Sequence, residues 1–427
     1  MRKFYQLILR SELLRNTSIL ISGTALAQLI PILLQPVLRR YFLPEAFGAY
    51  SVYLSLVGIL IVISSLRYEL AIILPKRDRD AAAVFFLAVF VSFLFNVFLL
   101  FIMLIWKNSL ADFLNLPAKF ENYLLLVPAG TFLFSTYQSI NYWLIRGKKF
   151  TAISINKFIR RGTEGSSQLA FMISKISQGL VYGDIMGQAA NIVSGIYQAK
   201  KAGLSFMLFS RKKISYMIKR YAEYPKFNII PSFMSACSYL LPALMINKFF
   251  SSEYTGYFDL SKLLLSVPMA LVATSVSNVL LQRVSEKNKS GLGIRGDLYP
   301  ILIFVLGAVI IEVIVIMLWS EDIFRIFFGS EWILSGTISK ILVWAFGFNF
   351  IVSCFSSLFI SLSRIKLLSI WQLIYFILIM SLSLFNYLSF RDFLVLYSVI
   401  EVFCCLLSAS FIFYIVRAYE KKLELIG

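Results

Sequence analysis

Twelve apolar runs recur along the chain and constrain its fold more than any other feature. An α-helix rises about 1.5 Å per residue, so a run of about 20 residues can cross the roughly 30 Å hydrocarbon core of a bilayer. Hydrophobic residues make up 59% of the chain and charged residues 15%, whereas soluble domains are about 45–50% apolar and about 25% charged. The sequence therefore predicts an all-α polytopic membrane protein. The predicted spans are 17–37, 46–66, 81–105, 122–144, 152–173, 180–199, 227–247, 256–281, 299–319, 337–361, 367–388 and 393–416.

Lysines and arginines lie mainly on one side of these spans. The N-terminus and every second connection after it hold most of the 41 basic residues, and the connections on the opposite side hold few. Cytoplasmic connections of membrane proteins are enriched in Lys and Arg, so we expect both termini in the cytoplasm. The net charge of +19 is then a topological signal and does not indicate nucleic-acid binding. The first apolar run continues past Ala25-Leu26-Ala27, so we expect an uncleaved span there rather than an export signal.

Several classes of chemistry lack the residues they need. The chain has no histidine, which excludes imidazole acid–base catalysis, Ser-His or Cys-His nucleophiles and imidazole-bound metals. Cys237, Cys354, Cys404 and Cys405 lie within apolar runs and form no CxxC pair, so we interpret them as core residues. The sequence has no GxxxxGKS/T loop for nucleotide phosphates and no long extracytoplasmic connection for a catalytic domain. We therefore expect neither an enzyme nor a resident cofactor or metal.

An internal repeat divides the chain near its middle. Residues 40–50 align with 248–258, so that a cation, two aromatic residues, a glutamate and a glycine coincide, and both stretches link the first span of a half to its second. A chance likeness between two short interfacial loops is the alternative. The repeat predicts an N-terminal six-helix lobe at 1–203, a basic cytoplasmic connector at 204–226 and a C-terminal six-helix lobe at 227–427.

Two tandem lobes favour transport as the function. Each lobe has an even number of spans, so both enter the membrane from the same face, and we expect an axis along the membrane normal to relate them. Duplicated halves of this kind are typical of secondary transporters, whose substrate site lies where the halves meet. We expect a monomer, because two lobes already enclose a path.

The fifth predicted span contains a stripe of ionisable residues. Lys157, Arg160, Arg161 and Glu164 follow helical spacing, and Lys175 lies close to five whole turns beyond Lys157. Buried ionisable groups usually face a water-filled path or a partner, and the planar guanidinium of arginine matches phosphate oxygens. The stripe predicts cations that bind an anionic substrate, with Glu164 as a coupling or gating residue. The alternative is an interfacial or cytoplasmic helix whose charges are solvated.

Other ionisable residues within the predicted spans are candidates for the second lobe. Asp259 and Lys262 lie at i and i+3, so they are either a substrate contact with a proton-linked carboxylate or a self-neutralised pair. Glu312 and Glu401 are lone carboxylates in their spans. Either could hold a coupling proton, and the alternative for each is a hydrogen-bonded contact between helices.

Arg67 and Glu69 lie at the cytoplasmic end of the second predicted span, before an apolar run that ends at Pro75. The pair is interpreted as a gate between two states of the transporter. A plain interfacial clasp is the alternative.

A series of short motifs, mostly near the ends of the predicted spans, follows one order along the chain. They are Asn16-Thr17-Ser18, Gly23 to Gln28, Pro31 and Pro36, Leu43 to Tyr50, Leu66 to Lys76, Tyr221 to Phe227 with Pro231-Ser232, Gly256-Tyr257-Phe258, and Ile323-Phe324 through Phe328-Gly329 to Trp332. In order and spacing they resemble bacterial polysaccharide flippases. These are the Wzx-type O-antigen and capsule repeat-unit exporters of the multidrug/oligosaccharidyl-lipid/polysaccharide (MOP) superfamily.

The resemblance implies a MATE-like fold of two lobes around a cavity, in the bacterial inner membrane. It implies that a polyprenyl-diphosphate-linked oligosaccharide moves from the cytoplasmic to the periplasmic leaflet by alternating access, with membrane lipids and other polysaccharide-assembly proteins as further partners. The fifth span departs from the family pattern, because its cluster from Lys157 to Glu164 is more charged than expected. The alternatives are a drug or cation antiporter of the same fold, a membrane-embedded polymerase or ligase, and a scaffold for glycan assembly.

Overall fold

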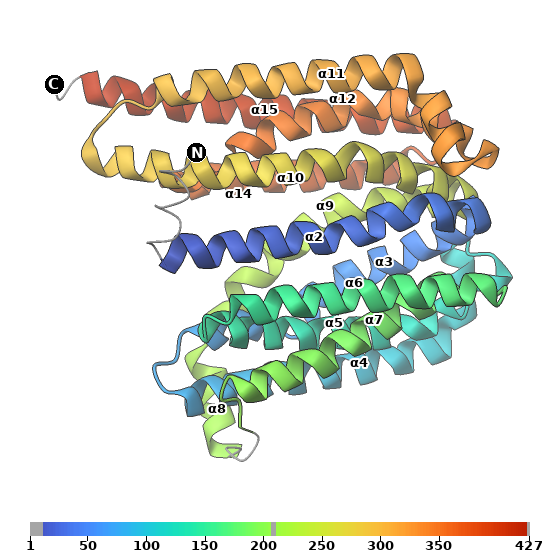
Figure 1. Ribbon diagram of the computed structural model, residues 1–427, viewed down its shortest axis with the longest axis horizontal. Helices are drawn as coiled ribbons and strands as arrows, with labels where there is room; N and C mark the ends of the chain where they lie inside the picture. Colours follow the sequence, from blue (N-terminus) through green and yellow to red (C-terminus); the bar gives the residue numbers. More distant parts are fainter. Residues whose placement is uncertain (1–11, 206–210, 425–427) are drawn as a thin grey trace. The chain divides into compact units, whose positions relative to one another are not determined.

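The computed structural model describes residues 12–205 and 211–424, and every regular element in these ranges is a helix (Figure 1). A helix is present at each of the twelve predicted spans. The α-helices are α2 (Glu12–Tyr41), α3 (Pro44–Ser64), α4 (Asp78–Leu114), α5 (Tyr123–Arg146), α6 (Phe150–Ile173), α7 (Gly179–Lys201), α8 (Arg211–Arg220), α9 (Glu223–Phe249), α10 (Ser252–Ser290), α11 (Arg295–Phe328), α12 (Ile333–Phe355), α13 (Leu358–Ser361), α14 (Ile365–Ser381) and α15 (Phe390–Glu424). Short 3-10 helices are η1 (Tyr68–Ile73), η2 (Ala118–Phe120), η3 (Ser330–Trp332) and η4 (Leu382–Leu384).

Most of the predicted spans differ in their ends from the helices observed, and three examples show how. The third continues to Leu114, with a kink at Trp106, where the backbone leaves the helical region at φ −108° and ψ 19°. The tenth is interrupted after Phe355 and resumes as α13. The eleventh ends earlier than expected, at Ser381, and passes into η4. Hydropathy therefore located the spans but not their ends or kinks.

Among the described residues, eight helical segments are long and apolar enough to cross a membrane, which confirms an all-α polytopic membrane protein. The helices α5, α6 and α7 fall outside this set, although each has more than 20 residues. Their hydropathy is lowered by polar side chains within the helices. These three helices line the cavity described below, together with α2.

The chain divides into two compact units, Met1–Ala236 and Cys237–Gly427, and the division falls within α9. The predicted lobes, 1–203 and 227–427 with a connector at 204–226, remain our proposal for the functional halves.

In the first unit, α6 packs closely against α7 (Figure 1). Gly179, Gly183 and Gly187 recur every fourth residue along α7, a small-residue spacing that lets two helix backbones approach. A Cβ atom on Gly187 would lie 2.7 Å from the Cβ of Glu164 and 2.9 Å from the carbonyl oxygen of Arg160. The glycines therefore allow the charged stretch of α6 to lie directly against α7.

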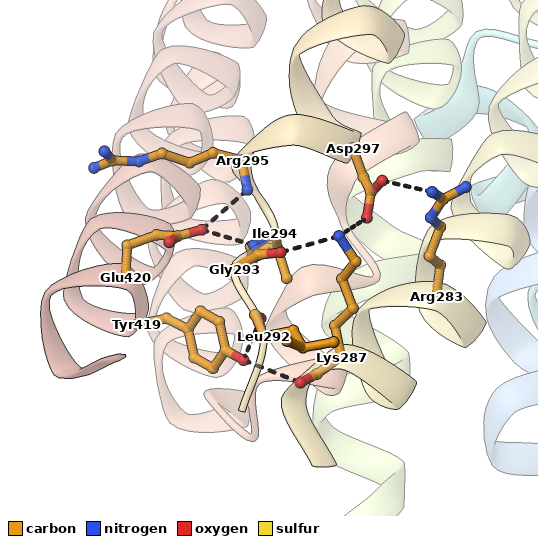
Figure 2. A network of polar contacts seen from close by, with 9 residues as sticks. All are labelled: Arg283, Lys287, Leu292, Gly293, Ile294, Arg295, Asp297, Tyr419 and Glu420. Atoms are coloured by element: carbon orange, nitrogen blue, oxygen red, sulfur yellow. Dashed lines mark hydrogen bonds and ion pairs between the residues drawn. The ribbon is translucent and has the colours of Figure 1, made fainter. Parts of the chain in front are cut away.

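In the second unit, the turn between α10 and α11 is held by the end of α15 (Figure 2). Oε1 of Glu420 accepts hydrogen bonds from the backbone N–H groups of Ile294, at 2.7 Å, and Arg295, at 2.9 Å. These N–H groups lie at the start of α11, where a helix has no partners for its first donors and favours negative charge. On the other side of the turn, Lys287 forms an ion pair of 2.7 Å with Asp297. Charged side chains thus close this turn from both sides.

Candidate functional site

A cavity of about 310 Å³ lies in the first unit, between side chains of α2, α5, α6 and α7. Three cations of α6, namely Lys157, Arg160 and Arg161, form part of its wall. Its other lining residues are neutral, and no aspartate or glutamate of the described chain is among them. The cavity therefore has a positively charged wall formed by residues of the first unit.

The two arginines are also paired with buried carboxylates. Nη2 of Arg160 lies 3.4 Å from Oδ1 of Asp184 on α7, and Nη1 of Arg161 lies 2.7 Å from Oε2 of Glu164 one turn further along α6. Both carboxylates are buried, and a buried charge is tolerated only with a partner. The four groups cancel in formal charge, so Lys157 gives this cluster a net positive charge.

The position of Lys175 differs from the expectation that it continues the stripe. The helix α6 ends at Ile173, and Lys175 follows it in a left-handed backbone conformation with φ 58°. Its side chain is exposed and does not line the cavity. Lys175 lies outside the helical stripe, because helical spacing has no meaning beyond the end of the helix.

Sequence reasoning missed most of the neutral residues that line this cavity and the ion-pair partner Asp184; two of the missed residues, Asp184 and Asn191, lie on α7. Asp184 is the only acidic residue of α7, and an ionisable residue within a membrane span is a candidate site residue by default. Together with the glycine spacing at Gly179, Gly183 and Gly187, it could have indicated that α7 packs its polar face on α6. Asn191 lines the cavity and has no such signal in the sequence.

The candidates of the second predicted lobe have aromatic neighbours. On α10, Nζ of Lys262 donates a 2.7 Å hydrogen bond to the carbonyl oxygen of Tyr239 and lies 3.4 Å from the centroid of its ring. Asp259 lies one turn earlier on the same helix and is half-buried. The ammonium group of Lys262 is thus stabilised by a carbonyl and a ring face.

The two lone carboxylates differ from each other. Glu401 on α15 is buried, and its Oε1 accepts a 2.7 Å hydrogen bond from the hydroxyl of Tyr375 on α14, which is the interhelical contact considered above. On α11, Glu312 is half-buried, and its Oε2 has no hydrogen-bond partner among the described residues. A coupling role for either residue remains a prediction.

Arg67 and Glu69 form a pair, with 3.4 Å between Nη1 and Oε1, at the start of η1. Nη2 of Arg67 also donates a 3.0 Å hydrogen bond to Oγ of Ser232 on α9, and Ser65 donates to Glu69. Glu69 is only 2% exposed. Burial raises the pKa of this carboxyl, although Ser65 and Arg67 oppose the shift. The pair therefore joins η1 to α9. A gate and an interfacial clasp would both make this contact.

The backbone around this pair is strained. Leu66 and Arg67 both have left-handed conformations, with φ 51° and 62°, which cost about 1–2 kcal/mol for residues other than glycine. The segment that follows is held by Arg146, whose Nη1 donates to the carbonyl oxygen of Ile73 at 3.2 Å and whose Nη2 pairs with Asp78 at 2.9 Å. These contacts hold the segment between Ile73 and Asp78, which follows the strained turn, against the end of α5.

Comparison with known proteins gives one family and one fold. A family model described as polysaccharide biosynthesis protein matches residues 37–336. A search of curated proteins finds no match for the chain.

Solved structures resemble the chain over nearly its whole length. The lipid II flippase MurJ, in an inward closed conformation, is 14% identical with a TM-score of 0.69, covering 96% of this chain and 92% of MurJ. An inward-facing multidrug resistance MATE family transporter of the MOP superfamily is 13% identical with a TM-score of 0.66, covering 92% of this chain and 96% of the transporter. A MOP superfamily transporter from Pyrococcus furiosus, described as having a binding pocket of reverse polarity, is 15% identical with a TM-score of 0.60, covering 95% of each chain. At these identities the likeness shows the fold, and the expected MATE-like fold is confirmed.

Proposed function

We propose, since the chain belongs to the polysaccharide biosynthesis protein family, that it is a flippase for a polyprenyl-diphosphate-linked oligosaccharide repeat unit. The cargo moves from the cytoplasmic to the periplasmic leaflet by alternating access, for the synthesis of O-antigen, capsule or exopolysaccharide. The observation that supports this proposal is the cavity wall formed by Lys157, Arg160 and Arg161. In the same proposal, the multi-pass protein lies in the bacterial inner membrane as a monomer with both termini in the cytoplasm.

The cations of the cavity suit a diphosphate. A guanidinium has five N–H donors in a planar fork. Arg160 uses Nη2 for Asp184, and its buried Nε has no partner among the described residues. Arg160 therefore keeps N–H donors for phosphate oxygens. Its charge is balanced by Asp184 when no cargo is bound, and Lys157 adds a positive charge.

The membrane potential assists outward movement of such a cargo. With the cytoplasm negative, moving a negative charge outward is favourable by about 2.3 kcal/mol per charge for each 100 mV. A doubly charged headgroup gains roughly twice that amount. The headgroup and sugars cross in the polar path, and the prenyl tail stays in the lipid.

A drug or cation antiporter is the second candidate function, because multidrug transporters share the fold. A cationic drug would be attracted by carboxylates in the cavity wall. The described carboxylates nearest this cluster, Asp184 and Glu164, are instead buried in ion pairs with arginines. The charge of the wall favours the anionic cargo.

The test is leaflet reversal of a labelled polyprenyl-diphosphate oligosaccharide in liposomes that contain the purified protein. We expect wild type to expose the label on the opposite leaflet and Lys157→Gln to slow this at least tenfold, because one cation of the wall is lost. The matched control is Lys366→Gln, at an exposed position of α14 in the second unit. A wild-type protein that moves no cargo, or a Lys157→Gln variant as fast as the control, contradicts the proposal.

A further inference from the structure

The cavity wall includes asparagine side chains with unmet hydrogen-bonding capacity. Asn191 on α7 is fully buried at 0% exposure and lines the cavity. Within the part of the chain that the structure describes, neither its Nδ2 nor its Oδ1 has a partner. Oδ1 of Asn141, on α5 at the same cavity, also has none. Buried polar groups in folded proteins are nearly always hydrogen-bonded, so such a group on a cavity wall points to a ligand.

The chemistry of these atoms differs from that of the neighbouring cations. Both amide atoms of Asn191 are unpartnered. Its nitrogen can donate to a ligand and its oxygen can accept from one, and this holds whichever way the amide is oriented. Asn141 adds a second acceptor. Ionised phosphate oxygens only accept hydrogen bonds, and therefore a diphosphate cannot satisfy either amide oxygen. A ligand that pairs with both atoms of the Asn191 amide must therefore both donate and accept hydrogen bonds.

Adjacent hydroxyl groups of a sugar ring have this property, because each hydroxyl both donates and accepts. One hydroxyl donates to an amide oxygen while its neighbour accepts from the amide nitrogen. Aromatic side chains suit the apolar C–H face of such a ring, and Phe134 and Tyr142 also line this cavity. The wall thus combines amide groups, rings and cations in one cavity.

We propose that Asn191 and Asn141 form a subsite for the sugar ring attached to the diphosphate, next to Lys157, Arg160 and Arg161. This inference rests on the flippase proposed above and assigns the residues that recognise the sugar. The subsite prefers rings with adjacent free hydroxyls, so that the protein discriminates a glycosylated lipid diphosphate from one without a hydroxylated ring.

A ligand-binding role and a structural role for Asn191 have different consequences. A structural asparagine loses hydrogen bonds on replacement, and the protein becomes less stable. Asn191 has no such bonds to lose, so Asn191→Leu, which keeps the side-chain shape, should melt at the wild-type temperature or higher. Groups kept for ligand binding at the expense of stability behave in this way.

The experiment measures binding of two probes to the full-length protein in phosphatidylcholine nanodiscs. Both are short-chain polyprenyl diphosphates, one esterified to a hexose and the other to a cyclohexyl ring of similar size without hydroxyls. We expect wild type to bind the hexosyl probe about tenfold more tightly, since two hydrogen bonds to buried groups distinguish the probes. Asn191→Leu should bind both probes with the affinity that wild type has for the cyclohexyl probe.

The control is Asn349→Leu, the same replacement at an exposed position of α12 in the second unit, which should keep the preference. Asn141→Leu, at a half-buried position, tests the subsite independently if Asn191→Leu does not fold, and it should weaken the preference. Equal binding of the two probes by wild type overturns the subsite and leaves the proposed flippase standing. If neither probe binds to the wild-type protein, both the subsite and the proposed flippase function are overturned.

Discussion

The guanidinium of Arg160 on α6 lies 3.4 Å from the carboxylate of Asp184 on α7, and this pair joins the two helices beside the cavity. The guanidinium also lies over the ring of Phe134 on α5, 5.1 Å from its centroid. One cavity residue of α6 therefore contacts two neighbouring helices of the first unit, α5 and α7. The protein's own contacts, with Asp184 and Phe134, hold the Arg160 side chain in position. The cationic wall is therefore organised before a cargo binds.

Replacing one member of this ion pair should destabilise the protein more than replacing both members. Arg160→Gln leaves the buried Asp184 carboxylate without its cation, which costs about 3–5 kcal/mol, and we expect a clear fall in melting temperature. The double variant Arg160→Gln/Asp184→Asn removes both charges and should recover most of the loss. Thermal unfolding of the purified single and double variants measures the coupling. Additive losses would contradict a stabilising pair.

The close contact between α6 and α7 should depend on Gly187. In Gly187→Ala the new Cβ would lie 2.9 Å from the Arg160 carbonyl oxygen, so the helices must separate. We expect the melting temperature to fall and transport to weaken, because the charged face of α6 shifts. The control is Gly162→Ala, also within a helix but with no atom within 4 Å of the added Cβ. That variant should gain about 0.5–1 kcal/mol from the higher helix propensity of alanine.

Glu420 should protect the start of α11 from local opening. Its carboxylate accepts two backbone hydrogen bonds (Figure 2), and such charge-assisted bonds are the stronger kind. In Glu420→Gln we expect hydrogen exchange at the amides of Ile294 and Arg295 to become about tenfold faster, which corresponds to about 1.4 kcal/mol. Glu424→Gln, at an exposed position near the same end of α15, is the control. Unchanged exchange in Glu420→Gln would show that the contact is not stabilising.

Glu69 should make stability depend on pH. Burial raises its pKa in the folded protein, so its contribution is fully present below the unfolded pKa of about 4.3 and is lost as the pH rises through the folded pKa. As the pH rises above the unfolded pKa of about 4.3, wild type should therefore lose stability relative to Glu69→Gln, which does not titrate. Melting temperatures of both proteins across this range test the prediction. Glu331→Gln, at an exposed position, should follow wild type, and a Glu69→Gln curve parallel to wild type would contradict the assignment.

Local patterns were sufficient for the helical class, for the positions of the long helices and for the stripe on α6. A helix lies at each of the twelve predicted apolar runs, because the hydrophobic requirement acts on each segment separately. Helical periodicity placed Lys157, Arg160 and Arg161 on one face, and the structure brings these three together at one cavity. The pairing of Arg67 with Glu69 was equally accessible, because the two residues are neighbours in the sequence.

The partners of these groups were decided by tertiary structure. Asp184 meets Arg160 only because glycines let α7 lie against α6, and Glu420 meets Ile294 across 126 residues of sequence. The unmet hydrogen bonds of Asn191 depend on every neighbour that packing brings near it. Sequence periodicity predicts the face of a helix on which a side chain lies, because that face depends on the geometry of one segment alone. The group that this face meets depends on how separate segments pack, which no single segment specifies.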